Sequence, residues 1–132
     1  RRFWSDPDEG NACRYASVAD MSFKKVSPGM PIFPCSDEHP YTAPVGKFPA
    51  NPFGLHDMLG NVAEWIEDCW NGDYSSAPEN GAVRSTGSCS ERGYRGGAWN
   101  GKPATVRSAY RDRESIEERH DHLGFRVVRV AP

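Results

Sequence analysis

The sequence predicts an α+β domain in which a small sheet is surrounded by long loops. Three observations carry this prediction. Residues 55–69 show apolar spacing typical of a helix, and two later segments have the character of strands. The 13 glycines and 11 prolines indicate many turns and little long regular structure. A chain of 132 residues is long enough for one domain with a core of its own.

The first fifty residues are predicted to be mostly loop. Segments 3–13, 24–35 and 36–54 are dense in Pro, Gly, Asp and Ser, which favour turns over regular structure. Connections this long need disulfides or bound ions to hold one conformation.

Residues 55–69 carry the strongest periodic pattern of the chain. The apolar positions with helical spacing are Leu55, Met58, Leu59, Val62, Trp65, Ile66 and Cys69. Gly60 and Asn61 interrupt the pattern, and a glycine after an apolar turn commonly ends a helix. Two interpretations remain open: one helix with a weak centre, or a single turn followed by a strand from Val62. Periodicity alone favours the helix.

Two segments of the C-terminal third are predicted to be strands. They are residues 91–99 and residues 123–130, the second with Phe125, Val127 and Val130 as its apolar positions. The chain between them, 100–122, is polar and is expected to be irregular.

The charge is unevenly distributed along the chain. Residues 92–129 hold nine Lys or Arg against five acids, whereas residues 1–91 hold seven against thirteen. A basic segment can attract nucleic acid, but eight of these nine bases are arginines interleaved with glycines, aromatics and acids. That arrangement favours internal ion pairs over nucleic-acid binding. No apolar run approaches 18 residues, so the sequence predicts no membrane span.

The chain contains four cysteines, Cys13, Cys35, Cys69 and Cys89, and none forms a CxxC pair. A structural zinc site or a thioredoxin-like site is therefore not favoured. An even count in a loop-rich chain predicts two disulfides, either sequential or crossed, with four buried thiols as the alternative. Sequential pairing closes two loops of similar size, each contributing roughly 3 kcal/mol of stability in the loop-entropy model. Disulfides indicate an oxidising location, periplasmic or extracellular.

Four motifs in order resemble the formylglycine-generating enzyme family, also called the sulfatase-modifying factor family. They are "TAPVGKFPANPFGLHDMLGNVAEW", "YRGGAW", "RSAYR" and "LGFRVVR", within a match from about Tyr15 to Val130. The resemblance implies an irregular α+β fold related to C-type lectins, with short helices and a small antiparallel sheet. It also implies a short helix ending near Gly60, followed by extended chain.

The resemblance implies that residues 1–132 are the C-terminal half of one such domain. The family's N-terminal half, with its "RLPTEAEWE"-like motif, is not in this sequence. Half a core would expose apolar surface, so we expect the missing half or another protein chain as a partner.

The resemblance implies a comparison with formylglycine-generating enzymes, which oxidise a substrate cysteine with copper held by two thiolates a few residues beyond the aromatic residue that follows Gly-Gly-Ser. Here Trp99 is followed by "NGKPATV", which contains no soft sulfur ligand for copper. Ala63 also stands where the family has the first tryptophan of its Gly-Asn-x-Trp-Glu-Trp motif. The resemblance therefore predicts neither copper nor a catalytic residue in this chain.

The same resemblance implies calcium as a cofactor. The favoured site consists of Asp57, Glu64 and the carbonyls of Gly60 and Val62, and these oxygens on a tight turn suit calcium. The alternative is that Asp57 caps a helical turn while Glu64 faces solvent.

A second implied calcium site consists of Ser17, Asp37 and the carbonyls of Val18 and His39. This site departs from the family pattern, because the family prefers Asn where Ser17 stands. Calcium binding and its absence are left equally open there.

Other conspicuous residues are expected to be structural. Arg107, Arg111 and Arg126 are predicted to brace loops rather than clamp an anion. His120 and His122 are expected to be solvated rather than to bind a metal. The aromatic residues Trp65, Trp70 and Trp99 are expected in the core rather than as a platform for sugars.

Taken with the resemblance, these residues predict a calcium-stabilised, non-catalytic domain that serves as a binding or accessory subunit. Two enzymatic alternatives remain. One is an oxidoreductase of the sulfoxide-synthase type, whose iron ligands lie outside this chain. The other is formylglycine generation with thiols supplied from elsewhere.

Overall fold

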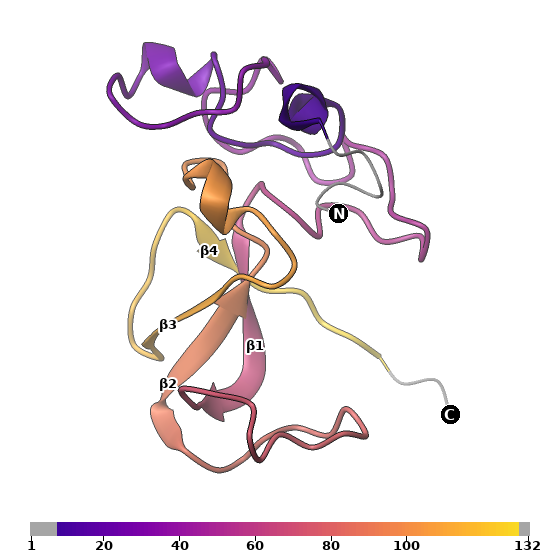
Figure 1. Ribbon diagram of the computed structural model, residues 1–132, viewed down its shortest axis with the longest axis vertical. Coiled ribbons are helices and arrows are strands. Elements are labelled where there is room, and N and C mark those ends of the chain that lie inside the picture. Colours follow the sequence, from indigo (N-terminus) through magenta and orange to yellow (C-terminus); the bar gives the residue numbers. More distant parts are fainter. Residues whose placement is uncertain (1–7, 130–132) are drawn as a thin grey trace.

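The computed structural model describes residues 8–129, which form a loop-rich region above a small sheet (Figure 1). The predicted loop residues 3–7 and the predicted strand position Val130 lie outside the described residues. The elements are η1 (Glu9–Arg14), η2 (Phe23–Lys25), β1 (Ala63–Trp70), β2 (Ser88–Arg95), η3 (Pro103–Thr105), β3 (Arg111–Ser115) and β4 (Leu123–Gly124). The three helices are short and of the 3-10 type, so the prediction of a small sheet with loops and short helices is confirmed.

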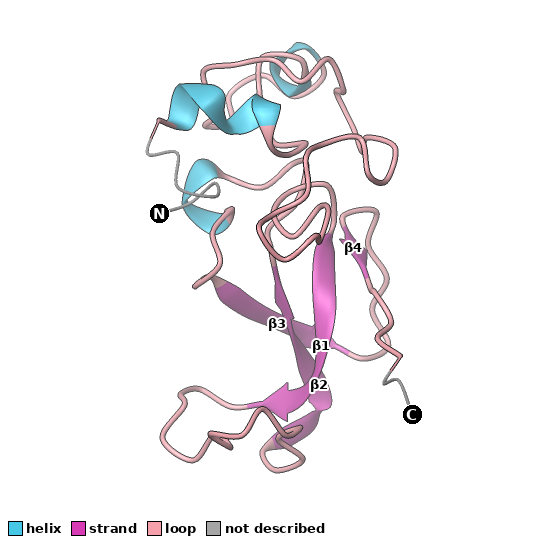
Figure 2. Cartoon of the chain, turned by 90° about the vertical axis from the view of Figure 1, so that its right-hand side faces the viewer, coloured by secondary structure: helices cyan, strands magenta, loops and turns pink. Residues whose placement is uncertain are grey.

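The sheet is mixed rather than antiparallel, with strand order β3-β2-β1-β4 (Figure 2). Strands β1, β2 and β3 pair antiparallel, whereas β4 pairs parallel to β1. After β3 the chain returns through residues 116–122 and reaches the free edge of β1 in the same direction as β1. The small antiparallel sheet that the resemblance implied is therefore corrected in one strand pair, β1 with β4.

Residues 55–62 form no helix, so both the long helix and the short helix ending near Gly60 were wrong. Three residues here have a positive φ angle: Asp57 at 54°, Gly60 at 74° and Asn61 at 58°. A Cβ on Gly60 would lie 2.2 Å from the carbonyl oxygen of Ser17. Asn61 donates its backbone N–H to that same oxygen at 2.8 Å. Tertiary hydrogen bonds thus replace the helical ladder, and β1 begins just after the turn.

The C-terminal predictions also needed correction. Only Leu123–Gly124 pairs as a strand, and the side chains of Phe125, Val127 and Val128 are 75%, 84% and 86% exposed. Conversely, the polar segment expected to be irregular contains β3, which pairs with β2 along its whole length. This strand forms because it pairs with β2 and not because its side chains alternate between apolar and polar. The periodicity of the sequence therefore could not predict it.

The core lies mostly between irregular segments. One cluster packs Ala12, Ala16, Val18, Phe33, Leu59 and Val106, and another packs Ala19, Phe23, Ala63, Ala98 and Trp99. Disulfides join Cys13 to Cys35 in the loops and Cys69 to Cys89 across β1 and β2. Of the sequential and crossed pairings that the sequence left open, the structure has the sequential one. None of the helices in residues 8–129 has the length and apolar character that crossing a membrane requires.

Candidate functional site

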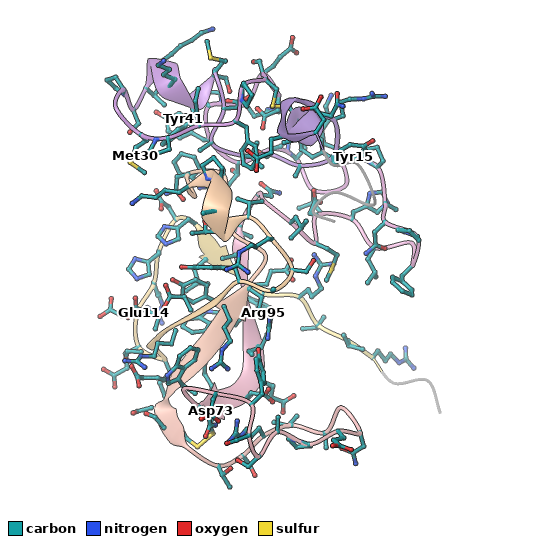
Figure 3. The ribbon with its side chains drawn as sticks, in the orientation of Figure 1. Tyr15, Met30, Tyr41, Asp73, Arg95 and Glu114 are labelled. Carbon is teal, nitrogen blue, oxygen red and sulfur yellow. A yellow bond between two sulfur atoms is a disulfide. The ribbon has the colours of Figure 1, made fainter. Side chains whose placement is uncertain are left out.

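A cavity of about 350 Å³ lies where β1, β3 and β4 begin and β2 ends, beside the turn that contains Asn100 and Lys102. Its floor consists of small or apolar residues, including Met30, Ala63 and Ala98. Its polar lining consists of Tyr94, Tyr110, Asn100, Lys102, Thr105 and His122. We call this cavity the tyrosine pocket. In Figure 3, Met30 lies at the edge of the loop region that is nearer to the sheet.

The turn beside the pocket is built by glycine. Gly96 and Gly97 have φ angles of 93° and 70°, a conformation that residues with a side chain rarely adopt. A Cβ on Gly97 would lie 2.9 Å from the Cα of Val106, so the two chain segments approach closely. The following Trp99 is 7% exposed and packs edge-to-face against Phe23 and Tyr41. This packing orients the segment that follows Trp99 along the pocket.

Sheet pairing places Asp112 behind the pocket. Trp65 pairs with Tyr94, and Tyr94 pairs with Asp112, so the three side chains share one face of the sheet. Asp112 accepts hydrogen bonds from the Tyr110 hydroxyl at 2.8 Å and from the backbone N–H of Arg113 at 2.9 Å. Among residues 8–129 no cationic side chain lies within ion-pair distance of Asp112. Its charge is balanced by neutral donors.

The two phenols stay protonated at physiological pH. Burial raises the pKa of Tyr94 to about 12, and the negative charge of Asp112 adds to this effect. Burial and the hydrogen bond to Asp112 also raise the pKa of Tyr110. Both phenols therefore remain neutral, although the guanidinium of Arg107 partly opposes the rise in the pKa of Tyr110.

His120 and His122 lie at the edge of the same face. Their rings stack with centroids 5.1 Å apart, and His120 Nε2 lies 3.6 Å from Glu114 Oε2. His122 Nδ1 lies 3.2 Å from Asp121 Oδ1. Within the described chain no three His, Cys, Asp or Glu side chains converge as metal ligands. The two histidines are thus engaged with carboxylates at the pocket rim.

The residues of the favoured calcium site lie together beside the C-terminal tail. Asp57 is 8% exposed, and its Oδ1 is buried without a hydrogen-bond partner, whereas Oδ2 accepts the Gly46 N–H at 2.8 Å. Such an unpartnered oxygen fits a cation. Glu64, however, receives Arg126 on both of its oxygens, including a bond of 2.5 Å from Nε. This ion pair raises the pKa of Arg126. The free Oδ1 of Asp57 can serve as a calcium ligand. Glu64 can do so only if the Arg126 side chain moves away from it.

The second predicted calcium site contains an acid that sequence reasoning missed. The Asp37 carboxylate accepts the backbone N–H groups of Val18 at 3.1 Å and His39 at 2.7 Å, while the Ser17 hydroxyl bonds the Tyr41 carbonyl at 3.3 Å. The fully buried Asp20 accepts the N–H of Asp37. Burial and repulsion by Asp20 raise the pKa of Asp37.

The pKa of Asp20 is shifted in the opposite direction from that of Asp37. Burial opposes ionisation of Asp20, but hydrogen bonds from the Ser22 hydroxyl and from backbone N–H groups outweigh it and lower the pKa. Asp20 and Asp37 therefore lie buried together and accept hydrogen bonds from backbone and hydroxyl donors, and no side-chain cation of residues 8–129 forms an ion pair with either.

Arg111 lies on the other face of the sheet. Its guanidinium is 4.4 Å from the ring centroids of both Trp70 and Tyr74, so it is held between two aromatic rings. Arg95 and Arg113 extend this stack at each end, over Tyr74 and Trp70 respectively. The stack, which we call the arginine ladder, attaches the loop 71–87 to the sheet.

Arg107 lies apart from the ladder. Its guanidinium is 5.8 Å from the ring centroid of Tyr110, and its Nε donates to the carbonyl of Ala104 at 3.0 Å.

A comparison with protein-family models matches residues 4–131 to the Sulfatase-modifying factor enzyme 1-like domain. The chain belongs to the sulfatase-modifying factor family. The chain is 28% identical over 128 residues to the formylglycine-generating enzyme of Mus musculus, covering 95% of this chain and 32% of that protein. It is 39% identical over 90 residues to the serine/threonine-protein kinase pkn1 of Chlamydia caviae, covering 67% of this chain and 15% of that protein.

Among solved structures, this family member resembles PvdO from Pseudomonas aeruginosa with a TM-score of 0.71 and 34% identity. The likeness covers 86% of this chain and 38% of PvdO. The chain therefore spans a third or less of the curated relatives named above, and well under half of PvdO. Those relatives contain this family region as part of larger proteins.

Sequence reasoning missed Asp20, Tyr94, Tyr110 and Asp112 as members of polar clusters. Tyr94 and Asp112 are 18 positions apart, and only strand pairing brings them together. A signal for Asp20 was present, because this acid directly follows the run Ala16, Ser17, Val18 and Ala19, which consists of small residues. That signal indicates a buried carboxylate that needs donors.

Proposed function

We propose that this chain is part of a non-catalytic domain of the sulfatase-modifying factor family, acting as a calcium-stabilised binding or accessory unit in a larger protein or assembly. One observation carries the proposal. All four cysteines are joined in disulfides, so the chain holds no thiol that can ligate copper. The segment after Trp99, where the resemblance implies the copper thiolates, also lacks cysteine.

The tyrosine pocket supports the binding part of this proposal. It lies beside the segment in which the resemblance implies copper chemistry, and it combines an apolar floor with a few convergent polar groups. Such a cavity is the usual form of a small-ligand site.

Exposed apolar surface supports the accessory part of the proposal. Phe125, Val127 and Val128 are largely exposed, and a cavity of about 560 Å³ separates this tail from Trp65 and Ile66 of β1. Apolar surface concentrated around one cavity is typical of a contact with another protein segment. The N-terminal part of the family domain is the occupant that the length of the relatives favours.

Two features support a calcium-stabilised, extracytoplasmic domain. The unpartnered Oδ1 of Asp57 and the paired carboxylates of Asp20 and Asp37 are negative groups that a divalent cation stabilises. The two disulfides suit an oxidising compartment, either periplasmic or extracellular.

The test uses the full-length protein that contains this chain, with the formylglycine-generating enzyme of Mus musculus as the positive control. Both are loaded with copper(I) and incubated with a cysteine-containing sulfatase peptide, and metal content is measured in parallel. We expect one or two bound calcium ions, no stoichiometric copper and no aldehyde product. Aldehyde formation would refute the proposal. Stoichiometric iron or copper with another oxidase activity would favour ligands outside this chain.

Calcium is tested separately by chelation. We expect chelators to lower the melting temperature of the full-length protein, and Asp57→Asn to reduce that shift without abolishing it. Unchanged melting after complete calcium removal would exclude a stabilising role for calcium.

A further inference from the structure

We propose that the tyrosine pocket binds a small zwitterion of the amino-acid type, with its ammonium group against Tyr94 and Tyr110 and its carboxylate toward Lys102. This inference rests on the proposed binding function and names the chemistry of its ligand. The cavity of about 350 Å³ accommodates a small molecule rather than a folded partner.

The tyrosines present an environment suited to a cation. The Tyr110 hydroxyl donates its hydrogen to Asp112 at 2.8 Å, and hydrogen bonding to the same carboxylate helps to raise the pKa of Tyr94. With its hydrogen directed at Asp112, the Tyr110 phenol offers the pocket an oxygen lone pair, and Tyr94, which lines the same cavity, offers an aromatic ring. Both attract an ammonium group, and a hydrogen bond to a carboxylate makes a phenol oxygen a better acceptor.

Asp112 supplies the negative charge behind the two phenols. No cationic side chain among the described residues forms an ion pair with it, and it accepts hydrogen bonds from the Tyr110 hydroxyl and the Arg113 backbone N–H. A carboxylate balanced only by neutral donors leaves a negative potential in its surroundings. An anionic ligand placed against Tyr110 would be repelled by the Asp112 carboxylate and would find the Tyr110 hydroxyl hydrogen already donated to it. The tyrosine side of the pocket therefore selects positive charge.

Lys102 adds a positive charge to the lining of the pocket. It is exposed, it lines the cavity, and no carboxylate within the described part of the chain forms an ion pair with it. A bare amine is repelled by Lys102, whereas a ligand with an amine and a carboxylate matches both charges. Met30, Ala63 and Ala98 provide an apolar floor for the rest of the ligand.

The experiment compares three probes that share one aromatic body: L-phenylalanine, phenethylamine and 3-phenylpropionate. Binding to the full-length protein is measured by calorimetry or ligand-observed NMR up to about 10 mM, which covers weak small-ligand affinities. We expect L-phenylalanine to bind most tightly and 3-phenylpropionate most weakly. Tighter binding of 3-phenylpropionate, or no binding of any probe, would overturn the inference.

Variants test each contact separately. Asp112→Asn and Tyr110→Phe are expected to weaken phenylalanine and phenethylamine by about tenfold and severalfold, respectively. Lys102→Gln is expected to weaken phenylalanine and to strengthen phenethylamine. A purely structural role for Lys102 would shift both probes in the same direction. Tyr74→Phe, on the opposite face of the sheet, is the matched control and should change neither affinity.

Failure of this inference is distinguishable from failure of the proposed function. The oxidase assay and the metal analysis use none of these probes, so a negative binding result leaves their outcome unchanged. Aldehyde formation together with selective phenylalanine binding would instead retain the pocket chemistry and reject the non-catalytic assignment.

Discussion

The loop region, residues 8–62, and the sheet region, residues 63–129, differ in a way that reverses the usual expectation. Most buried apolar side chains of the described chain lie in irregular segments, and the strands contribute only Ala63 and Cys69. The sheet is regular but open, whereas the loops are irregular but densely packed. Regular hydrogen bonding therefore does not mark the core of this protein, and the open faces of the sheet are where further contacts belong.

The two regions also balance charge differently. In the loop region, Asp20 and Asp37 are buried and are stabilised by backbone and hydroxyl donors. In the sheet region, arginines pair with Glu64 and Glu91, whereas Asp112 accepts hydrogen bonds from neutral donors. Long arginine side chains reach their partners across an open surface, whereas a packed interior leaves room only for its own backbone donors.

The largest effect is expected from a substitution in the densely packed loop region. Gly60→Ala places a Cβ 2.2 Å from a backbone oxygen in a left-handed conformation, so we expect at least about 4 kcal/mol of destabilisation or no folding. Gly54→Ala is the control, because Gly54 also has a positive φ angle but has free space around it. It should cost about 1 to 2 kcal/mol in urea unfolding of the full-length protein. Equal losses would contradict the role of close packing.

Removing each disulfide compares the two regions directly. The bridges span similar separations, 22 and 20 residues, so the loop-entropy model expects a similar loss of about 3 kcal/mol from each. Both Cys13 and Cys35 pack against a core cluster, whereas in the second bridge Cys69 is buried but Cys89 is exposed. Cys13→Ala/Cys35→Ala should therefore cost about 1 kcal/mol more than Cys69→Ala/Cys89→Ala in unfolding experiments. The reverse order would show that the sheet region is the more tightly packed one.

A smaller effect is expected from the arginine ladder. Arg111→Lys keeps the charge but loses the planar group held between two rings, and should cost about 1 kcal/mol of unfolding free energy. Arg113→Lys, at the exposed end of the ladder, should cost less than about 0.5 kcal/mol. If both changes cost the same, stacking in the ladder does not stabilise the sheet region.

The smallest effect at neutral pH concerns Tyr94. Its folded-state pKa of about 12 exceeds the usual value of 10, so the folded protein retains a proton that the unfolded chain loses. Stability should therefore be unaffected below pH 10 and should fall as the pH rises from 10 to 12. Phenolate absorbance of the wild type minus Tyr94→Phe should show a transition near 12. A transition near 10 would mean that Tyr94 is not buried beside Asp112.

Family membership and the loop-rich character were predictable from the sequence because they depend on local motifs. The helix at 55–69 was predicted wrongly because three left-handed residues and bonds to Ser17 override its periodicity. The strand β3 gave no periodic signal, since its five residues are all polar. The candidate pocket was missed for the same reason, because strand pairing and not sequence distance joins Tyr94 to Asp112.

By itself, the sequence determined the family, the absence of cysteine after Trp99 and the even number of cysteines. These properties reside in residue identity and spacing, which no folding step changes. The tertiary structure alone decided which cysteines pair, which edge of β1 receives β4, and which carboxylates have no cationic partner within residues 8–129. Each of these depends on segments far apart in the chain meeting through hydrogen bonds and packing, and such contacts leave no periodic trace in the sequence.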